Sequence, residues 1–162
     1  MNDAEAQEAQ RTTAMGLITD AKNMLQAAKI LHEFGVRTVK GPTYYLLGHA
    51  IEVALKSFLL ANGTSLTVLR KRIGHDLGKA ARRAIAVRLN TLTPVVQEYL
   101  GYIELLNVYY EAKEFEYRVT GLKSYPPKEK LFEFLEAIIP IIEPIAFQAL
   151  KQRRTQSQPH AT

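Results

Sequence analysis

The chain has 162 residues, of which 47% are hydrophobic and 23% are charged, the composition of a soluble globular domain. This composition excludes collagen-like, wholly disordered and disulfide-scaffold proteins. There is no cysteine, so disulfides, thiolate zinc sites and a cysteine nucleophile are excluded as well. The formal net charge of +5 is informative only if the excess is concentrated on one part of the surface.

The first two predicted elements are amphipathic helices separated by glycine and proline. The first is expected over about residues 4–34 and ends at Gly35. The second is expected to begin after Gly41-Pro42 and to run to about residue 61, where Asn62-Gly63 is a stop signal.

A third helix is expected over about residues 75–90, because Gly74 precedes it. Thr93-Pro94 has the pattern of an N-cap residue followed by proline in the first helical position. This pair predicts a fourth helix that runs to about Phe115.

The last helix is expected to begin at Pro126-Pro127 and to continue to about Lys151. Pro140 and Pro144 fall inside it, and each removes a backbone donor and crowds the preceding turn. A bend near residues 136–144 is therefore expected.

These elements predict an all-α fold, an up-and-down bundle of about five helices, because no segment has the pattern of a strand. Residues 1–151 form one domain, and the polar residues 152–162 are expected to be a disordered tail. The apolar stretch 131–150 is interrupted by three glutamates, which favours a buried core helix over a membrane span. The acidic N-terminus has no secretory pattern, so a cytoplasmic location is expected.

The positive charge is concentrated in residues 62–92, where seven Lys and Arg residues stand against Asp76 alone, a net charge of +6. The remainder of the chain carries −1. A clustered basic surface of this kind could hold phosphates, or it could pair with the acidic residues of segment 98–116. The candidate phosphate-binding residues are Arg70, Lys71, Arg72, Lys79, Arg82 and Arg83.

Residues 50–59 of the second helix read A-I-E-V-A-L-K-S-F-L, and residues 74–77 read G-H-D-L. A Tyr-Arg pair, Tyr117-Arg118, follows near the end of the fourth helix. These three motifs resemble those of the HEPN superfamily of bacterial helical-bundle proteins, over about residues 15–150.

The resemblance implies a bundle of four or five helices, often a homodimer, in a family many of whose members bind or cut RNA in toxin–antitoxin and other defence systems. Nucleases of the family carry, on the C-terminal core helix, an Arg that is separated from a following His by four to six residues. Here no His follows Arg118 until His160, and Arg70 has the right spacing only to His75, in the structural G-H-D-L motif. The chain is therefore expected to lack the nuclease signature in its usual place, and His75, Arg118 and Arg70 are the only candidate catalytic residues.

A polar cluster is expected around Glu52 and Lys56, which lie one turn apart on the second helix. The pair is either an ordinary surface ion pair or part of a cluster with His75 and Arg118. His75 and Asp76 precede a helix, so capping is the expected role there, and Asp76 is favoured by the positive helix N-terminus.

No metal or cofactor is expected, because the four histidines are scattered and no phosphate-binding loop or nucleophile elbow is present. The fourth helix is apolar on nearly all sides and contains four tyrosines, so it is either central in its own bundle or shared with a partner, and a homodimer is favoured. The tyrosines are Tyr99, Tyr102, Tyr109 and Tyr110.

The sequence thus favours a cytoplasmic, dimeric, non-catalytic module that interacts with other molecules, RNA among them. A metal-independent ribonuclease toxin is the first alternative. The second is a purely structural partner of another protein, such as a nucleotidyltransferase-type antitoxin.

Overall fold

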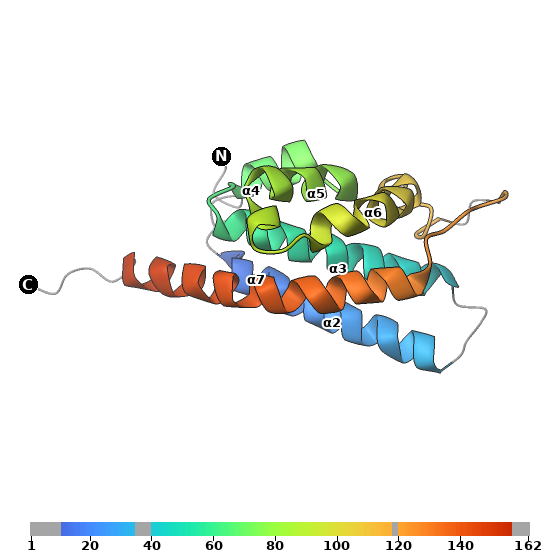
Figure 1. Ribbon diagram of the computed structural model, residues 1–162, viewed down its shortest axis with the longest axis horizontal. Coiled ribbons are helices and arrows are strands. Elements are labelled where there is room, and N and C mark those ends of the chain that lie inside the picture. The colour runs from blue at the N-terminus through green and yellow to red at the C-terminus, as the bar shows by residue number, and fades with distance from the viewer. Residues whose placement is uncertain (1–10, 35–39, 118–119, 157–162) are drawn as a thin grey trace, which may run out of the picture.

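The computed structural model describes residues 11–34, 40–117 and 120–156, and every regular element in these ranges is helical (Figure 1). The all-α class is therefore confirmed. The longer helices are α2 (Ala14–Glu33), α3 (Lys40–Ala61), α5 (Leu77–Ala86), α6 (Val95–Glu111) and α7 (Lys128–Gln156). Shorter elements are the single turn α4 (Leu66–Val68), the π-helical turn η1 (Leu69–Ile73) and the 3₁₀ turn η2 (Leu89–Thr91).

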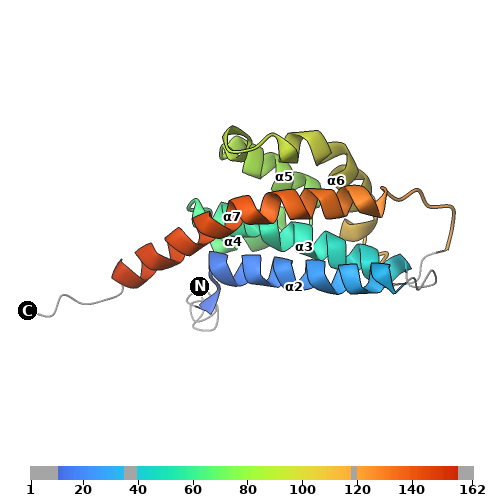
Figure 2. The ribbon, with the colours of Figure 1, turned by 60° about the horizontal axis from the view of Figure 1, so that its bottom comes forward.

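Helix α3 is the centre of the bundle. It packs against α2 and α7 on one side and against α5 and α6 on the other, as Figures 1 and 2 show. Thirteen of its 22 residues are buried, which is more than one face of a helix can supply. Any polar residue on α3 therefore has to find its partners inside the protein.

The first helix is shorter than expected within the described residues. Thr12 and Thr13 are not helical, and the hydroxyl of Thr13 accepts a hydrogen bond of 3.0 Å from the Gly16 amide, so α2 starts at Ala14. The prediction of a continuous helix from residue 4 is therefore wrong at Thr12 and Thr13. Residues 4–10 and the expected helix end at Gly35 lie outside the described ranges.

The third and fourth helices also end earlier than expected. Helix α5 stops at Ala86, and Arg88 adopts a left-handed conformation with φ of 69°. At the start of α6 Pro94 takes the N-cap position, and the Thr93 hydroxyl accepts from the Val95 amide at 3.3 Å. The helix ends at Glu111 because the chain turns, and Lys113 has φ of 58°.

Helix α7 continues to Gln156, so the expected tail was placed too early for residues 152–156. The Arg153 guanidinium donates to the carbonyl of Thr12 at 3.1 Å and holds this end of α7 against the start of α2. Pro140 and Pro144 both lie on the exposed side, where water can solvate the carbonyls that lose their partners. In Figure 2 the C-terminal part of α7 runs at an angle to its first half.

The apolar stretch 131–150 supplies the core, with Leu131, Phe134, Leu135, Ile138 and Ile142 fully buried. Among the helices of the described ranges, none combines the length and hydropathy required of a segment that crosses a bilayer.

The close approach of α3 and α6 predicts opposite effects of alanine at two glycines. A Cβ at Gly48 would lie 2.5 Å from Cδ2 of Tyr110, whereas a Cβ at Gly101 in α6 meets nothing within 4 Å. We expect Gly48→Ala to lower the free energy of unfolding by roughly 1–3 kcal/mol, because the tyrosine ring has to move. Gly101→Ala should raise it by about 0.5–1 kcal/mol through helix propensity.

Urea denaturation of the two variants and of the wild type measures both values. A Gly48→Ala variant as stable as the wild type would contradict the tight packing of Tyr110 on α3.

Candidate functional site

The carboxylate of Glu52 lies at the centre of a buried polar cluster. Glu52 belongs to α3 and is only 3% exposed. Its Oε1 accepts a hydrogen bond of 2.6 Å from the Nζ of Lys56, one turn further along the helix. Its Oε2 accepts a 2.6 Å bond from the hydroxyl of Tyr110 on α6, and Nδ1 of His75 lies 3.1 Å away. One carboxylate thus joins α3, α6 and the loop before α5.

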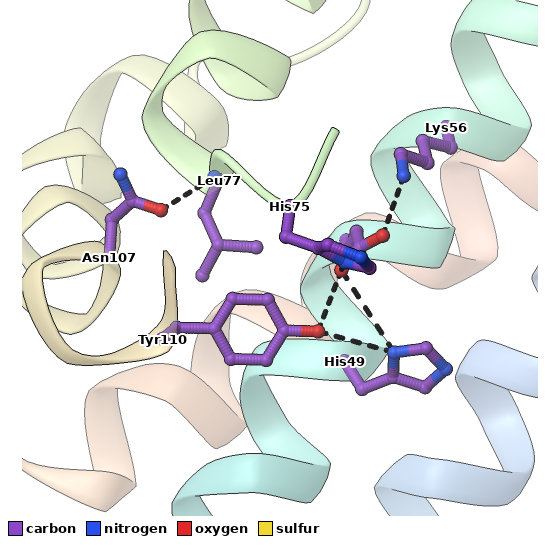
Figure 3. Close-up of polar contacts among 7 residues, drawn as sticks. His49, Lys56, His75, Leu77, Asn107 and Tyr110 are labelled. Carbon is purple, nitrogen blue, oxygen red and sulfur yellow. Dashed lines mark hydrogen bonds and ion pairs between the residues drawn. The ribbon is translucent and has the colours of Figure 1, made fainter. Parts of the chain in front are cut away.

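A second histidine, His49, stands beside this cluster (Figure 3). Its Nδ1 lies 3.2 Å from the Tyr110 hydroxyl and 4.0 Å from Oε2 of Glu52. The ring of His49 is parallel to that of Tyr45, with 6.1 Å between the ring centroids. Both imidazoles therefore approach the same carboxylate oxygen, His49 from α3 itself and His75 from the loop.

The partners of Glu52 keep it ionised. Burial by itself would raise the pKa of Glu52, but hydrogen bonds from Lys56 and Tyr110, the charge of Lys56 and a hydrogen bond from His75 bring the pKa below its usual value. For Tyr110, burial and the neighbouring Glu52 carboxylate raise the pKa far above its ordinary value, so the phenol stays protonated and donates. The cluster contains a stable negative charge with three donors around it.

Asp76 lies next to this cluster but belongs to a separate set of hydrogen bonds. Its Oδ1 accepts from the Lys79 amide at 2.8 Å, and Asp76 is thus the N-cap of α5. The side-chain Nδ2 of Asn107 on α6 donates to the same oxygen of Asp76 at 3.0 Å. The Oδ1 of Asn107 accepts from the Leu77 amide at 2.7 Å. Two orphan amides at the start of α5 are satisfied in this way.

The sequence pointed to part of this arrangement. The structure brings Glu52, Lys56 and His75 together and places Asp76 one residue away as a cap, whereas Arg118 lies outside the described residues. The sequence also places His49 three residues before Glu52 on the same helix flank, although the predicted cluster did not include it. Sequence reasoning missed Asn107 and the role of Tyr110.

Three of the four α6 tyrosines bond to residues of their own chain, as expected of a helix that is central in its own bundle. Tyr110 is buried against α3, the Tyr99 hydroxyl donates to Glu133 of α7 at 2.8 Å, and the Tyr109 hydroxyl accepts from the Ser124 amide at 3.0 Å. The exposed apolar positions of α6 are instead Leu105 and Val108, which are 36% and 61% exposed.

The six candidate phosphate-binding residues are all exposed, on η1 and on α5. Arg82 forms an ion pair with Glu104 of α6, and Lys79 forms one with Asp76 at 3.3 Å. The alternative that basic residues pair with acidic residues of segment 98–116 is therefore confirmed for Arg82. Three others have no carboxylate within 4.0 Å in the described part of the chain, namely Lys71, Arg72 and Arg83.

The π-helical turn η1 presents Arg70, Lys71 and Arg72 as three consecutive exposed residues between the buried Leu69 and Ile73. Gly74 follows with φ of 60°, a conformation that favours glycine, and leads the chain to His75. The hydrogen bonds of His75 and Asp76 therefore anchor the segment that carries the basic residues.

The chemistry available at the site is that of a carboxylate–imidazole pair. The His75 side chain is 60% exposed, so the ring nitrogen that does not face Glu52 can exchange a proton with a molecule in solution. Among the residues that the structure describes, no three His, Asp or Glu side chains lie close enough together to hold a metal ion.

Comparison of the chain with protein-family models, with curated proteins and with solved structures finds no match.

The buried carboxylate predicts a pH-dependent loss of stability. Because the pKa of Glu52 is lower in the folded protein than in the unfolded chain, its contribution is complete above the unfolded value and is lost as the pH falls below about 5. We expect Glu52→Gln to lower the free energy of unfolding at pH 7 by roughly 2–4 kcal/mol, because Lys56 loses its buried partner.

The difference between wild type and Glu52→Gln should shrink as the pH is lowered from 7 to 3, measured by urea denaturation at each pH. Glu98→Gln, on the exposed side of α6, serves as the control and should be within about 0.5 kcal/mol of wild type. A pH-independent difference would show that the charge of Glu52 is not what the variant removes.

Proposed function

We propose that the chain is a cytoplasmic, HEPN-like helical module that dimerises and binds RNA without cleaving it, through the basic residues of η1 and α5. The observation that carries this proposal is the set of exposed cations Lys71, Arg72 and Arg83, which no described carboxylate neutralises. Lys and Arg side chains in such a cluster bind phosphates by charge, release counterions and give salt-dependent affinity.

The ordered structure of residues 69–84, which carry all six candidate phosphate-binding residues, supports the same proposal. Its two ends are buried at Leu69 and Ala84, and between them the turn is held by the hydrogen bonds of His75 and Asp76. Cations held on an ordered segment lose less conformational freedom on binding than cations on a free loop. For dimerisation, the support is the exposed stripe of Gly101, Leu105 and Val108 along α6, a surface that a second copy would cover.

Replacing the three unneutralised cations should weaken RNA binding and its salt dependence. The triple variant Lys71→Gln, Arg72→Gln, Arg83→Gln lowers the net charge from +5 to +2. For a single-stranded oligonucleotide each phosphate contact contributes about 0.7 to the slope of log K against log salt, so the slope should fall in magnitude by about 2. Filter binding at several salt concentrations measures this slope.

The matched control removes the same charge elsewhere, with Lys113→Gln, Lys151→Gln and Arg154→Gln at exposed positions. It should bind RNA nearly as the wild type does. Equal losses in both triple variants would mean that net charge alone attracts RNA, and salt-independent binding or no binding would refute the proposal.

A metal-independent ribonuclease is the second candidate, because a buried carboxylate orients an exposed imidazole at His75. In such a reaction the imidazole takes the proton of a ribose 2′-hydroxyl, whose oxygen attacks the adjacent phosphorus while the 5′-oxygen leaves with a proton. Arg70, on the neighbouring turn, would stabilise the charge on the phosphorus oxygens.

Purified wild type, His75→Ala and His32→Ala separate the two candidates when each is incubated with bulk RNA free of metal ions. A ribonuclease that uses His75 should lose activity about 100-fold or more in His75→Ala and retain it in His32→Ala, whose ring lies against Phe132 away from the site. RNA that stays intact with all three proteins supports the non-catalytic module, and equal cleavage by all three removes His75 from the chemistry.

A further inference from the structure

A pocket of about 320 Å³ lies between α2 and α7, which pack side by side in Figures 1 and 2. Its volume is at the lower end of the range of about 300–1,000 Å³ that is typical of small-molecule sites. The buried part of its wall consists of Leu25, Leu135 and Ile139, each at most 9% exposed. An alkyl group that enters the pocket is therefore in contact with aliphatic side chains.

Two ion pairs neutralise the charged residues of this pocket. The Nζ of Lys22 lies 2.6 Å from Oε1 of Glu143, and the Nζ of Lys29 lies 2.6 Å from Oε1 of Glu136. Lys22, Lys29 and Glu136 belong to the wall, and each has its counterion on the opposite helix. Because every charged residue of the wall is paired, the pocket favours a neutral ligand over an anion or a cation.

Pro140 leaves a backbone acceptor open in the wall. A carbonyl inside an α-helix normally accepts from the amide four residues later, and proline has no amide hydrogen. The carbonyl of Glu136 therefore lacks its usual donor within α7. A helical carbonyl points toward the residue four positions on, so this one lies between Glu136 and Pro140, and both residues line the pocket. Water can satisfy this carbonyl, and so can a ligand hydroxyl that takes the place of the water.

Gln26 supplies a complementary group from the opposite helix. It is an exposed residue of α2 in the wall of the pocket, and its carboxamide carries two donors and an acceptor. A hydroxyl group both donates and accepts, so it can bond to the Glu136 carbonyl and also receive a hydrogen bond from Gln26. An ether or a ketone is neutral as well, but it lacks the donor that the carbonyl requires.

We propose that this pocket binds a small aliphatic alcohol, with its hydroxyl on the Glu136 carbonyl and its alkyl chain against Leu25, Leu135 and Ile139. Binding buries the alkyl chain, while the hydroxyl replaces the hydrogen bond of the displaced water. The inference is independent of the proposed RNA binding, because it uses no residue of η1 or α5.

Two isomeric probes, 1-hexanol and methyl pentyl ether, test the proposal on the full chain. They have the same molecular formula, and only the alcohol has a hydrogen-bond donor. A titration followed by the amide chemical shifts of α2 and α7 measures both the affinity and the place of binding. We expect 1-hexanol to bind with Kd of about 1 mM and the ether to bind about 10-fold more weakly. Equal affinities, or no shift changes with 1-hexanol at 10-fold this concentration, would overturn the proposal.

Charged analogues of the same chain length test the preference for a neutral ligand. Hexanoate and hexylammonium should both bind more weakly than 1-hexanol, because the counterions of Lys22, Lys29 and Glu136 are already in place. Tighter binding of either ion would contradict the assignment of an alcohol.

Two proline variants test the role of the backbone carbonyl. Pro140→Ala gives the Glu136 carbonyl an amide partner within the helix, so 1-hexanol should lose its advantage over the ether, and α7 should remain folded. Pro144→Ala, at an exposed position outside the wall, gives an amide partner to the carbonyl of residue 140 and should leave the 10-fold preference unchanged. A preference for 1-hexanol that persists in Pro140→Ala would refute the proposed hydrogen bond.

Two tryptophan variants on α2 test the location. Gln26→Trp places an indole in the pocket and should abolish 1-hexanol binding. Asn23→Trp makes the same kind of change at an exposed residue outside the wall and should bind 1-hexanol as the wild type does. Binding that survives Gln26→Trp in a folded protein would place the ligand elsewhere and overturn the assignment of this pocket.

Discussion

The ionised carboxylate of Glu52 is the interaction on which the arrangement of the other elements depends. A charge buried on the central helix is tolerable only when donors surround it, and those donors come from three places in the chain. Tyr110 connects α6 to α3, His75 connects the loop before α5, and Lys56 balances the charge. Removing Tyr110 or His75 therefore weakens the attachment of a neighbouring element to α3, whereas removing Lys56 leaves a buried charge without its counterion.

The same anchoring links the core to the surface. Beyond His75 the chain enters α5 through the Asp76 cap, which Asn107 of α6 supports. The basic residues of η1 and α5 therefore stand on an ordered segment, although they themselves are exposed. In this protein the polar core and the candidate binding surface are neighbours along the chain, because only Ile73 and Gly74 separate Arg72 from His75.

Helical periodicity predicted the all-α class, because the apolar spacing of each long helix is a local property. The ends were less predictable: the start of α2 depends on the Thr13 hydroxyl, and the extension of α7 past Lys151 is accompanied by a contact between Arg153 and the Thr12 carbonyl. The Glu52–Lys56 pair follows from spacing along one helix. Tyr110 and Asn107 could not be predicted, since they reach α3 and α5 only after tertiary packing of α6.

The π-helical turn η1 fixes the number of residues between two buried anchors but does not fix which side chains its exposed positions carry. Leu69 and Ile73 are buried at its two ends, and the amide of Gly74 donates back to the Leu69 carbonyl, so the number of residues between the two anchors is set by the closure of the turn. Insertion or deletion of one residue would remove an anchor from the core, whereas the side chains of Lys71 and Arg72 between them are exposed and lie outside the core. During evolution, Lys71 and Arg72 can therefore be exchanged for other residues without loss of the fold, and a change at these two positions alters what the surface binds.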